Sequence, residues 1–140
     1  NAITEAKLAV GLGAYWTKYT IGFADLQTAA LTNTIELVEL AALNCIEAIV
    51  AKSTTAFAGT SITAVGVEIG LSADADKYLD SYDVLATVAD ANRTASNQPP
   101  EPETFTGTTS IKLKATAVGA NLSALSAGSV DIWVKRSVLP

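Results

Sequence analysis

Four aspartates lie close together between residues 74 and 83 and form the main carboxylate cluster of the chain. Several oxygens on one loop suit a hard cation such as Ca²⁺, and two converging carboxylates can do acid–base chemistry. A calcium loop of the EF-hand type that began at Asp74 would need Gly at its sixth position and Glu at its twelfth, where this chain has Leu79 and Leu85. We therefore interpret the cluster as solvated turn residues and predict no metal site. Its members are Asp74, Asp76, Asp80 and Asp83.

The residue types that most often do chemistry are missing or isolated. The chain has no histidine, which excludes Ser-His-Asp and Cys-His nucleophiles and removes the commonest transition-metal ligand. Cys45 is the single cysteine, so no disulfide can form within the chain, and its apolar neighbours predict a buried, inert thiol. No GxGxxG or GK[ST] motif occurs that would cradle a phosphate. We predict no catalytic residue, no cofactor and no enzymatic activity.

The composition indicates a folded chain that contacts other protein. Of its 140 residues, 49% are hydrophobic and 16% are charged, which is too apolar for disorder and less charged than the usual soluble surface. The formal net charge of −5 argues against a nucleic-acid partner. No apolar run reaches the length that would cross a membrane, so no membrane partner is expected. The low charge suggests that part of the surface faces other protein.

Alternation of apolar and polar residues predicts several short strands. Aromatic, β-branched and aliphatic side chains recur at every second position in four stretches. By this phase Trp16 and Trp133 point outward from their strands. The four stretches are 15–23, 62–70, 108–118 and 130–138.

The stretch at 34–53 supports two interpretations. Its Glu, Leu and Ala residues are strong helix formers, and one continuous helix would gather the apolar side chains on one stripe. The alternative is two strands, at 34–40 and 45–53, joined by a turn at 41–44. Local propensity alone favours the helix.

The pattern as a whole predicts an all-β fold, an antiparallel sandwich of jelly-roll or Greek-key type with one or two short helical turns. We expect an N-terminal arm or first strand at 1–14. A single β-sandwich domain follows at 15–140, with a proline-rich loop at 91–104. The less regular stretches are a loop at 71–76 and an irregular or briefly helical segment at 78–85. Residues 25–33 are expected as a loop or a single helical turn, and residues 121–125 as one helical turn with Asn121 as N-cap.

Two long segments combine strands, glycines and turns in a recognisable order. The first is FAGTSITAVGVEIGLSADADKYLDSYDVL at 57–85, in which Phe-x-Gly starts a strand, Gly70 ends it and an acidic loop precedes Tyr-Leu. The second is FTGTTSIKLKATAVGANLSALSAGSVDIWVKRSVLP at 105–140, with its I-x-L-x-A-T-x-x-G-x-N-L-x-x-L-x-A-G-x-V-x-I-x-V pattern. Over residues 15–140 the chain is similar to the cement (decoration) proteins of tailed-bacteriophage capsids.

The resemblance implies a structural virion protein on the capsid exterior, which bridges neighbouring major capsid protein subunits and stabilises the shell. It implies the major capsid protein as partner, and self-association as a homodimer or trimer. It also favours two strands at 34–53, although the AALN turn at 41–44 departs from the Pro-Gly type of turn expected there.

Five residues are predicted to bind partners. An exposed tryptophan is a common interface anchor, so Trp16 and Trp133 are candidates unless both faces of their sheet are covered. Arg93 can pair with a partner carboxylate or remain a solvated loop charge. Lys135 and Arg136 belong to the C-terminal tail, which we expect to contact the shell together with the N-terminal arm and the 86–104 loop.

A binding module of another class is the alternative. A carbohydrate-binding or adhesin domain of the virion surface, or a head-fibre module, would use the same fold. In that case either tryptophan would stack on sugar rings.

Overall fold

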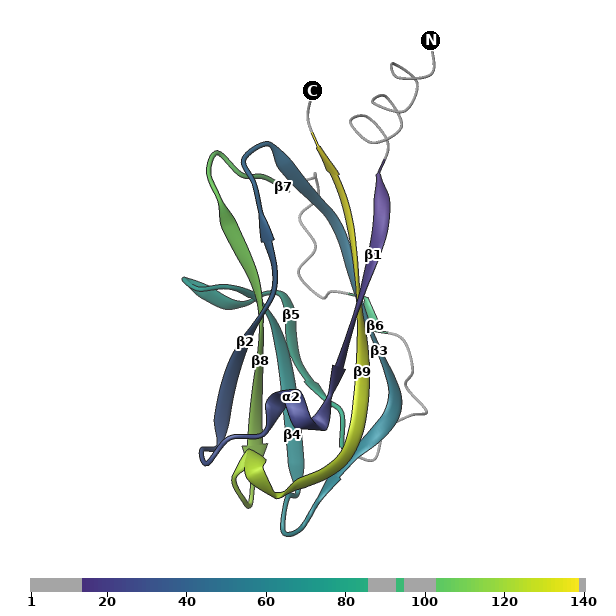
Figure 1. Ribbon diagram of the computed structural model, residues 1–140, viewed down its shortest axis with the longest axis vertical. Coiled ribbons are helices and arrows are strands. Elements are labelled where there is room, and N and C mark those ends of the chain that lie inside the picture. Colours follow the sequence, from purple (N-terminus) through teal and green to yellow (C-terminus); the bar gives the residue numbers. More distant parts are fainter. Residues whose placement is uncertain (1–13, 86–92, 95–102, 139–140) are drawn as a thin grey trace.

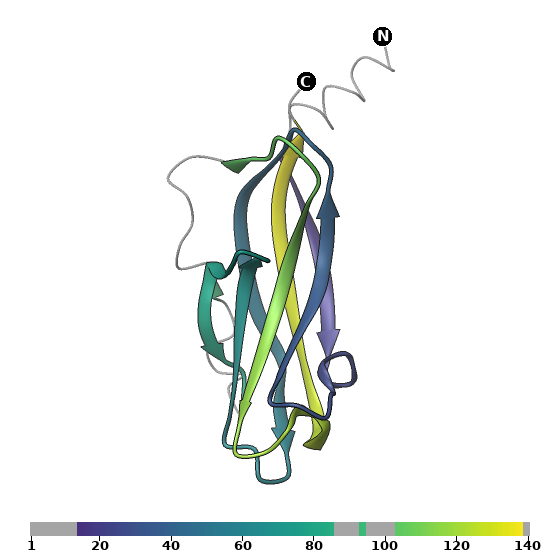
Figure 2. The same ribbon diagram turned by 90° about the vertical axis from the view of Figure 1, so that its left-hand side faces the viewer.

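Two antiparallel sheets pack face to face in the computed structural model, which describes residues 14–85, 93–94 and 103–138 (Figures 1 and 2). Sheet A has the strand order β1-β9-β3-β6, with β7 also paired to β3, and sheet B has the order β2-β8-β4-β5. The strands are β1 Tyr15–Gly22, β2 Thr32–Leu40, β3 Asn44–Gly59, β4 Ala64–Leu71, β5 Asp74–Asp83, β6 Arg93–Thr94, β7 Glu103–Thr104, β8 Thr109–Val118 and β9 Leu125–Val138.

This strand order is that of a jelly roll. The chain passes from sheet A to sheet B between β1 and β2, returns for β3 and crosses again to β4. The last two long strands then insert between earlier ones, β8 between β2 and β4 and β9 between β1 and β3. The predicted all-β antiparallel sandwich is confirmed.

Alternation along the strands places one set of side chains between the sheets. In β8, Ile111 and Leu113 are fully buried, and in β9 the same is true of Ile132 and Val134. The inward phase predicted for these strands is confirmed. Burying each such side chain contributes about 1.5–3 kcal/mol relative to exposure, so this period of two is what holds the sheets together.

The stretch at 34–53 forms two strands and no helix, as the resemblance implied. β2 ends at Leu40 and β3 begins at Asn44. In the turn between them Leu43 has a φ of 69°, and its N–H donates to the carbonyl of Phe105 at 2.9 Å. The pairing of β2 with β8 and of β3 with β9 overrides the local helix propensity.

The expectation of a loop at 71–76 followed by an irregular or briefly helical segment at 78–85 is wrong, because β5 covers most of this stretch and pairs with β4. The register of this pair shifts on both sides of Ile69. As a result Tyr78 and Leu79 are both buried although they are neighbours in the sequence. The period of two that marks a strand is therefore lost here.

Two short helical turns occur in the described part of the chain, as predicted. The helix α2 (Phe23–Leu26) follows β1, and the 3-10 turn η1 (Leu122–Ala124) precedes β9. Asn121 is the N-cap residue of η1, as predicted, but its side chain makes no capping hydrogen bond. Its Nδ2 donates instead to the carbonyl of Ala29 at 3.3 Å. Among the described residues no helix is long and apolar enough to cross a membrane.

Gly128 in β9 lies where the backbone touches an aromatic ring. Its φ is 132°, and a Cβ at this position would lie 2.3 Å from Cγ of Phe57. Phe57 is only 1% exposed, so the ring has no room to move. This close approach requires glycine.

Part of the predicted proline-rich loop at 91–104 forms two very short strands. β6 pairs with β3 at Val50 and Ala51, and β7 pairs with β3 at Cys45 and Ile46. The rest of that loop and the predicted arm, except Ala14, lie outside the described residues.

Candidate functional site

The outer face of sheet A gathers aromatic and basic side chains from three neighbouring strands. In β1, Trp16 and Lys18 alternate with the inward-facing positions, and Trp133 and Lys135 do the same in β9. β3 adds Val50 and Lys52 beside them, because β9 lies between β1 and β3. We call this surface the aromatic–basic face; its residues are Trp16, Lys18, Val50, Lys52, Asp131, Trp133 and Lys135.

Each tryptophan of the face is paired across the strands with a lysine. The register of β1 and β9 sets Lys18 opposite Trp133 and Lys135 opposite Trp16. The Nζ of Lys18 lies 5.6 Å from the centroid of the Trp133 ring, and the Nζ of Lys135 lies 6.0 Å from that of Trp16. Each such cation–π contact contributes about 0.5–1 kcal/mol at an exposed site. Each indole therefore has one positive charge over its ring.

An open depression of about 380 Å³ is lined by both indoles. Val50, Lys52 and Asp131 complete its lining. The carboxylate of Asp131 accepts a hydrogen bond of 2.7 Å from the hydroxyl of Thr20. An apolar centre with a charged rim is the composition of many protein-binding surfaces.

The two tryptophans differ in exposure. Trp16, on the edge strand β1, is 46% exposed, whereas Trp133 on the central strand β9 is half-buried. Both lie on the outward phase of their strands, as the sequence pattern indicated. Their role in binding a partner stays a prediction.

Of the two arginines of the predicted site, Arg136 lies on the opposite side of β9 from Lys135. Arg136 is opposite Tyr15 and Ile46, and its guanidinium carbon lies 5.4 Å from the centroid of the Tyr15 ring. Its Nε is buried and has no hydrogen-bond partner among the described residues. Arg93 belongs to β6 at the edge of sheet A, where it is registered with Ala51; nothing is described of its side chain.

The sequence pattern therefore predicts only part of the site. The structure brings Trp16, Trp133 and Lys135 together and adds Lys18, which was not predicted. A signal for it exists, because the motif Trp-x-Lys occurs once in β1 and once in β9. Antiparallel pairing converts the two motifs into reciprocal Trp–Lys contacts.

The residues with the most obvious chemistry form no reactive centre in the described part of the chain. Cys45 is buried, as predicted. No group of three or more cysteines and carboxylates that could hold a metal occurs among the described residues. A hydrogen bond with Asp76 raises the pKa of the Asp74 carboxyl above its ordinary value, and desolvation and the charge of Asp76 raise it further.

The fold defines a class, the two-sheet jelly rolls, which includes viral capsid and lectin domains. Among solved structures the chain is similar to a chain of the cyanophage Pam1 capsid asymmetric unit. The TM-score is 0.64 with 17% identity, over 91% of this chain and 85% of that chain. It is also similar to a chain of the acidic stable capsid of Helicobacter pylori bacteriophage KHP30. There the TM-score is 0.54 with 17% identity, over 87% of this chain and 86% of that one.

No protein-family model matches the chain, and no curated protein matches it. At 17% identity the likeness to the two capsid chains shows the fold. The chain therefore has the jelly-roll fold of chains found in two phage capsids.

Proposed function

We propose that this chain is a structural virion protein of a tailed bacteriophage, which binds the outside of the icosahedral capsid and bridges neighbouring major capsid protein subunits. The observation that carries the proposal is the likeness to capsid chains, which covers 85% and 86% of those chains and so spans proteins of about this size. The resemblance of segments 57–85 and 105–140 to cement proteins supports the exterior, bridging role. In this role the protein does no chemistry and is not an enzyme.

Stabilisation of a shell follows from mass action. A protein that binds the assembled lattice better than free subunits shifts the equilibrium toward the lattice. A specific contact needs about 800 Å² per partner, and several contacts made by one oligomer multiply its avidity. A rigid sandwich with more than one binding surface meets these requirements.

One end of the sandwich has the properties of a shell contact. β1 starts at this end, β9 ends there, and the β2–β3 turn lies beside them (Figure 1). Tyr15 is 37% exposed and Leu43, in the turn, is 48% exposed. The positive φ of Leu43 costs about 1–2 kcal/mol in a residue other than glycine, yet it holds an apolar side chain in solvent. We propose that this end meets the shell, which agrees with the contact expected from segments 1–14 and 135–140.

Binding to emptied shells that lack the protein tests this function. We expect saturable co-sedimentation, a higher temperature of shell disruption, and weaker binding after Leu43→Asp or deletion of residues 1–14. Val118→Asp is the matched control, because Val118 is also an exposed apolar residue, with 55% of its surface exposed. It ends β8, and the start of β8 pairs with Leu40 beside the β2–β3 turn, so Val118 lies at the opposite end of the sandwich. A protein that does not bind assembled shells, or that binds free subunits equally well, would contradict the proposal.

One observation favours carbohydrate binding as a second function. The two indoles line the same depression, and aromatic rings of this kind can stack on sugars. Against it, Lys18 and Lys135 lie over the two rings. Saturable glycan binding that is lost in Trp133→Ala, by a protein that does not bind shells, would favour this second function.

A further inference from the structure

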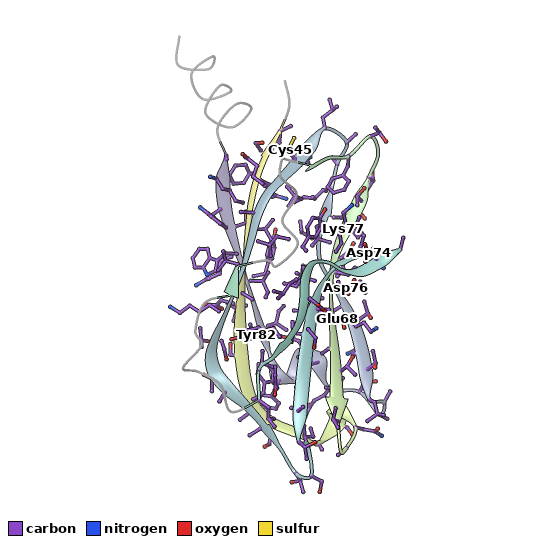
Figure 3. The ribbon with its side chains drawn as sticks, turned by 180° about the vertical axis from the view of Figure 1, so that it is seen from behind. Cys45, Glu68, Asp74, Asp76, Lys77 and Tyr82 are labelled. Atoms are coloured by element: carbon purple, nitrogen blue, oxygen red, sulfur yellow. The ribbon has the colours of Figure 1, made fainter. Side chains whose placement is uncertain are left out.

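An acidic projection on sheet B complements the aromatic–basic face of sheet A. β4 and β5 form a hairpin whose tip projects from the body of the sandwich (Figures 1 and 3). Leu71 and Asp74 are opposite each other at this tip, and the carboxylates of Asp74 and Asp76 are exposed. The residues between the strands, Ser72 and Ala73, are small. We call residues 71–76 the acidic tip.

The two surfaces have opposite charge in a chain whose net charge is −5. The aromatic–basic face has three lysines and one aspartate, Asp131, and that carboxylate already accepts a hydrogen bond from Thr20. The acidic tip has two carboxylates and no lysine, although Lys77 follows it and Lys112 and Lys114 line a depression beside Leu71 and Ser72. Surfaces of opposite potential steer two molecules together and fix their register.

We propose that the acidic tip of one copy of this chain binds the aromatic–basic face of a second copy. In this contact the carboxylates of Asp74 and Asp76 pair with Lys18 and Lys135. The small side chains of the tip enter the depression of about 380 Å³ that the indoles line. The ammonium of each lysine can donate to a carboxylate and still lie over the indole ring, because one cation can make both contacts.

The electrostatics of the tip support this contact. Asp74 and Asp76 are close enough to share a hydrogen bond, and their mutual effect raises the pKa of the Asp74 carboxyl. The charge of Lys77 lowers the same pKa but does not cancel the effects that raise it. Two lysines of a second copy would relieve the remaining repulsion.

The symmetry of the contact follows from the positions of the two surfaces. The tip belongs to sheet B and the face to sheet A, so each copy uses two different patches. Such heterologous contacts build closed rings, or open chains where the rotation does not close. This inference deepens the proposed multi-copy role and rests on it, but its test needs no shell, so the two can fail separately.

Charge reversal tests the contact in the purified protein. Sedimentation velocity at low salt should show concentration-dependent association of the wild type. Lys18→Glu with Lys135→Glu, or Asp74→Lys with Asp76→Lys, should each weaken it at least tenfold. Glu36→Lys with Glu39→Lys is the control for the second pair. It changes the net charge equally on β2, at the other edge of sheet B, and should leave association unchanged.

Mixing the two reversed variants gives the sharpest result. Neither variant should associate alone, but an equal mixture should, because every contact between unlike copies again joins opposite charges. Combining all four substitutions in one chain, which keeps the net charge at −5, should also restore association. Circular dichroism and thermal melting of each variant verify that it is folded.

Three results would overturn the proposal. One is a wild-type protein that stays monomeric at concentrations up to about 1 mM, because a contact with a larger dissociation constant would be too weak to be useful. Another is association that survives both reversals, as it would if copies joined through the edge of β1. The last is a mixture of the reversed variants that remains monomeric.

Discussion

The outer faces of the two sheets have the same architecture and expose different chemistry. Sheet A exposes tryptophans with lysines over them, whereas sheet B carries mostly carboxylates, and its tyrosines Tyr78 and Tyr82 are buried. Beneath both faces the inward positions hold mostly aliphatic side chains, with a few buried aromatic rings. The core therefore fixes the fold, and the outward positions, which the core does not constrain, are where binding chemistry can differ.

The largest effect should come from breaking the frame that both faces share. Gly128→Ala adds a Cβ 2.3 Å from the buried Phe57 ring, at a φ of 132°. We expect a loss of about 2–4 kcal/mol in the free energy of unfolding, from overpacking together with backbone strain. Denaturant titration measures it. Gly107→Ala is the control, since a Cβ there meets nothing within 4 Å; equal losses in both variants would contradict the packing account.

The next effect should separate the two faces. Trp133→Ala removes one indole of the depression and the partner of Lys18, and we expect association of copies to weaken about tenfold, as for a central aromatic anchor. Glu39→Ala on sheet B should change the same dissociation constant by less than about twofold, because isolated surface charges contribute little. Analytical ultracentrifugation measures both. A larger increase of the dissociation constant in Glu39→Ala than in Trp133→Ala would contradict this difference between the two faces.

Salt should weaken the charged contact and leave the core intact. The distance over which charges interact falls from about 10 Å at 0.1 M to about 3 Å at 1 M salt. Association through the acidic tip should therefore decrease severalfold over that range, whereas the melting temperature should change little. Association that strengthens with salt would indicate an apolar contact instead.

The smallest effect concerns the carboxylates of the tip. The pKa of Asp74 is raised in the folded chain, so the folded state binds that proton more tightly than the unfolded state. The interaction between Asp74 and Asp76 therefore destabilises the folded state at pH values above the raised pKa of Asp74. This destabilisation disappears at pH values below the ordinary pKa of 3.8. Asp76→Asn should move the pKa of Asp74 down and increase stability slightly at neutral pH only.

Titration of the Asp74 carboxyl by NMR measures this shift. Asp80→Asn is the control, because Asp80 is not among the groups that shift Asp74. An unchanged pKa of Asp74 in Asp76→Asn would show that Asp76 is not the cause.

The sequence predicts elements well where a strand has one buried and one solvated face. β1 and β8 alternate regularly and have nearly the predicted bounds, whereas β9 begins at Leu125, well before the predicted start at residue 130. β5 was missed because the register shifts around Ile69 bury two adjacent residues. The two strands at 34–53 required the resemblance, since their stability comes from β8 and β9, which are distant in the sequence.

The candidate site was only partly predictable. The phase of the strands showed that Trp16 and Trp133 point outward, but their proximity depends on the β1–β9 register, which no local pattern contains. The separation of Arg136 from Lys135 was available from the sequence, because neighbouring residues of a strand point to opposite faces.

The copy number of the chain in purified virions tests the central claim most directly. Quantitative mass spectrometry of intact particles, with lysine labelling from outside, measures both number and location. The account predicts on the order of hundreds of copies per particle, as an icosahedral lattice repeats its subunits, all accessible to the label. A handful of copies would indicate a tail or fibre component, and a chain absent from the particle or inaccessible to the label would contradict the account.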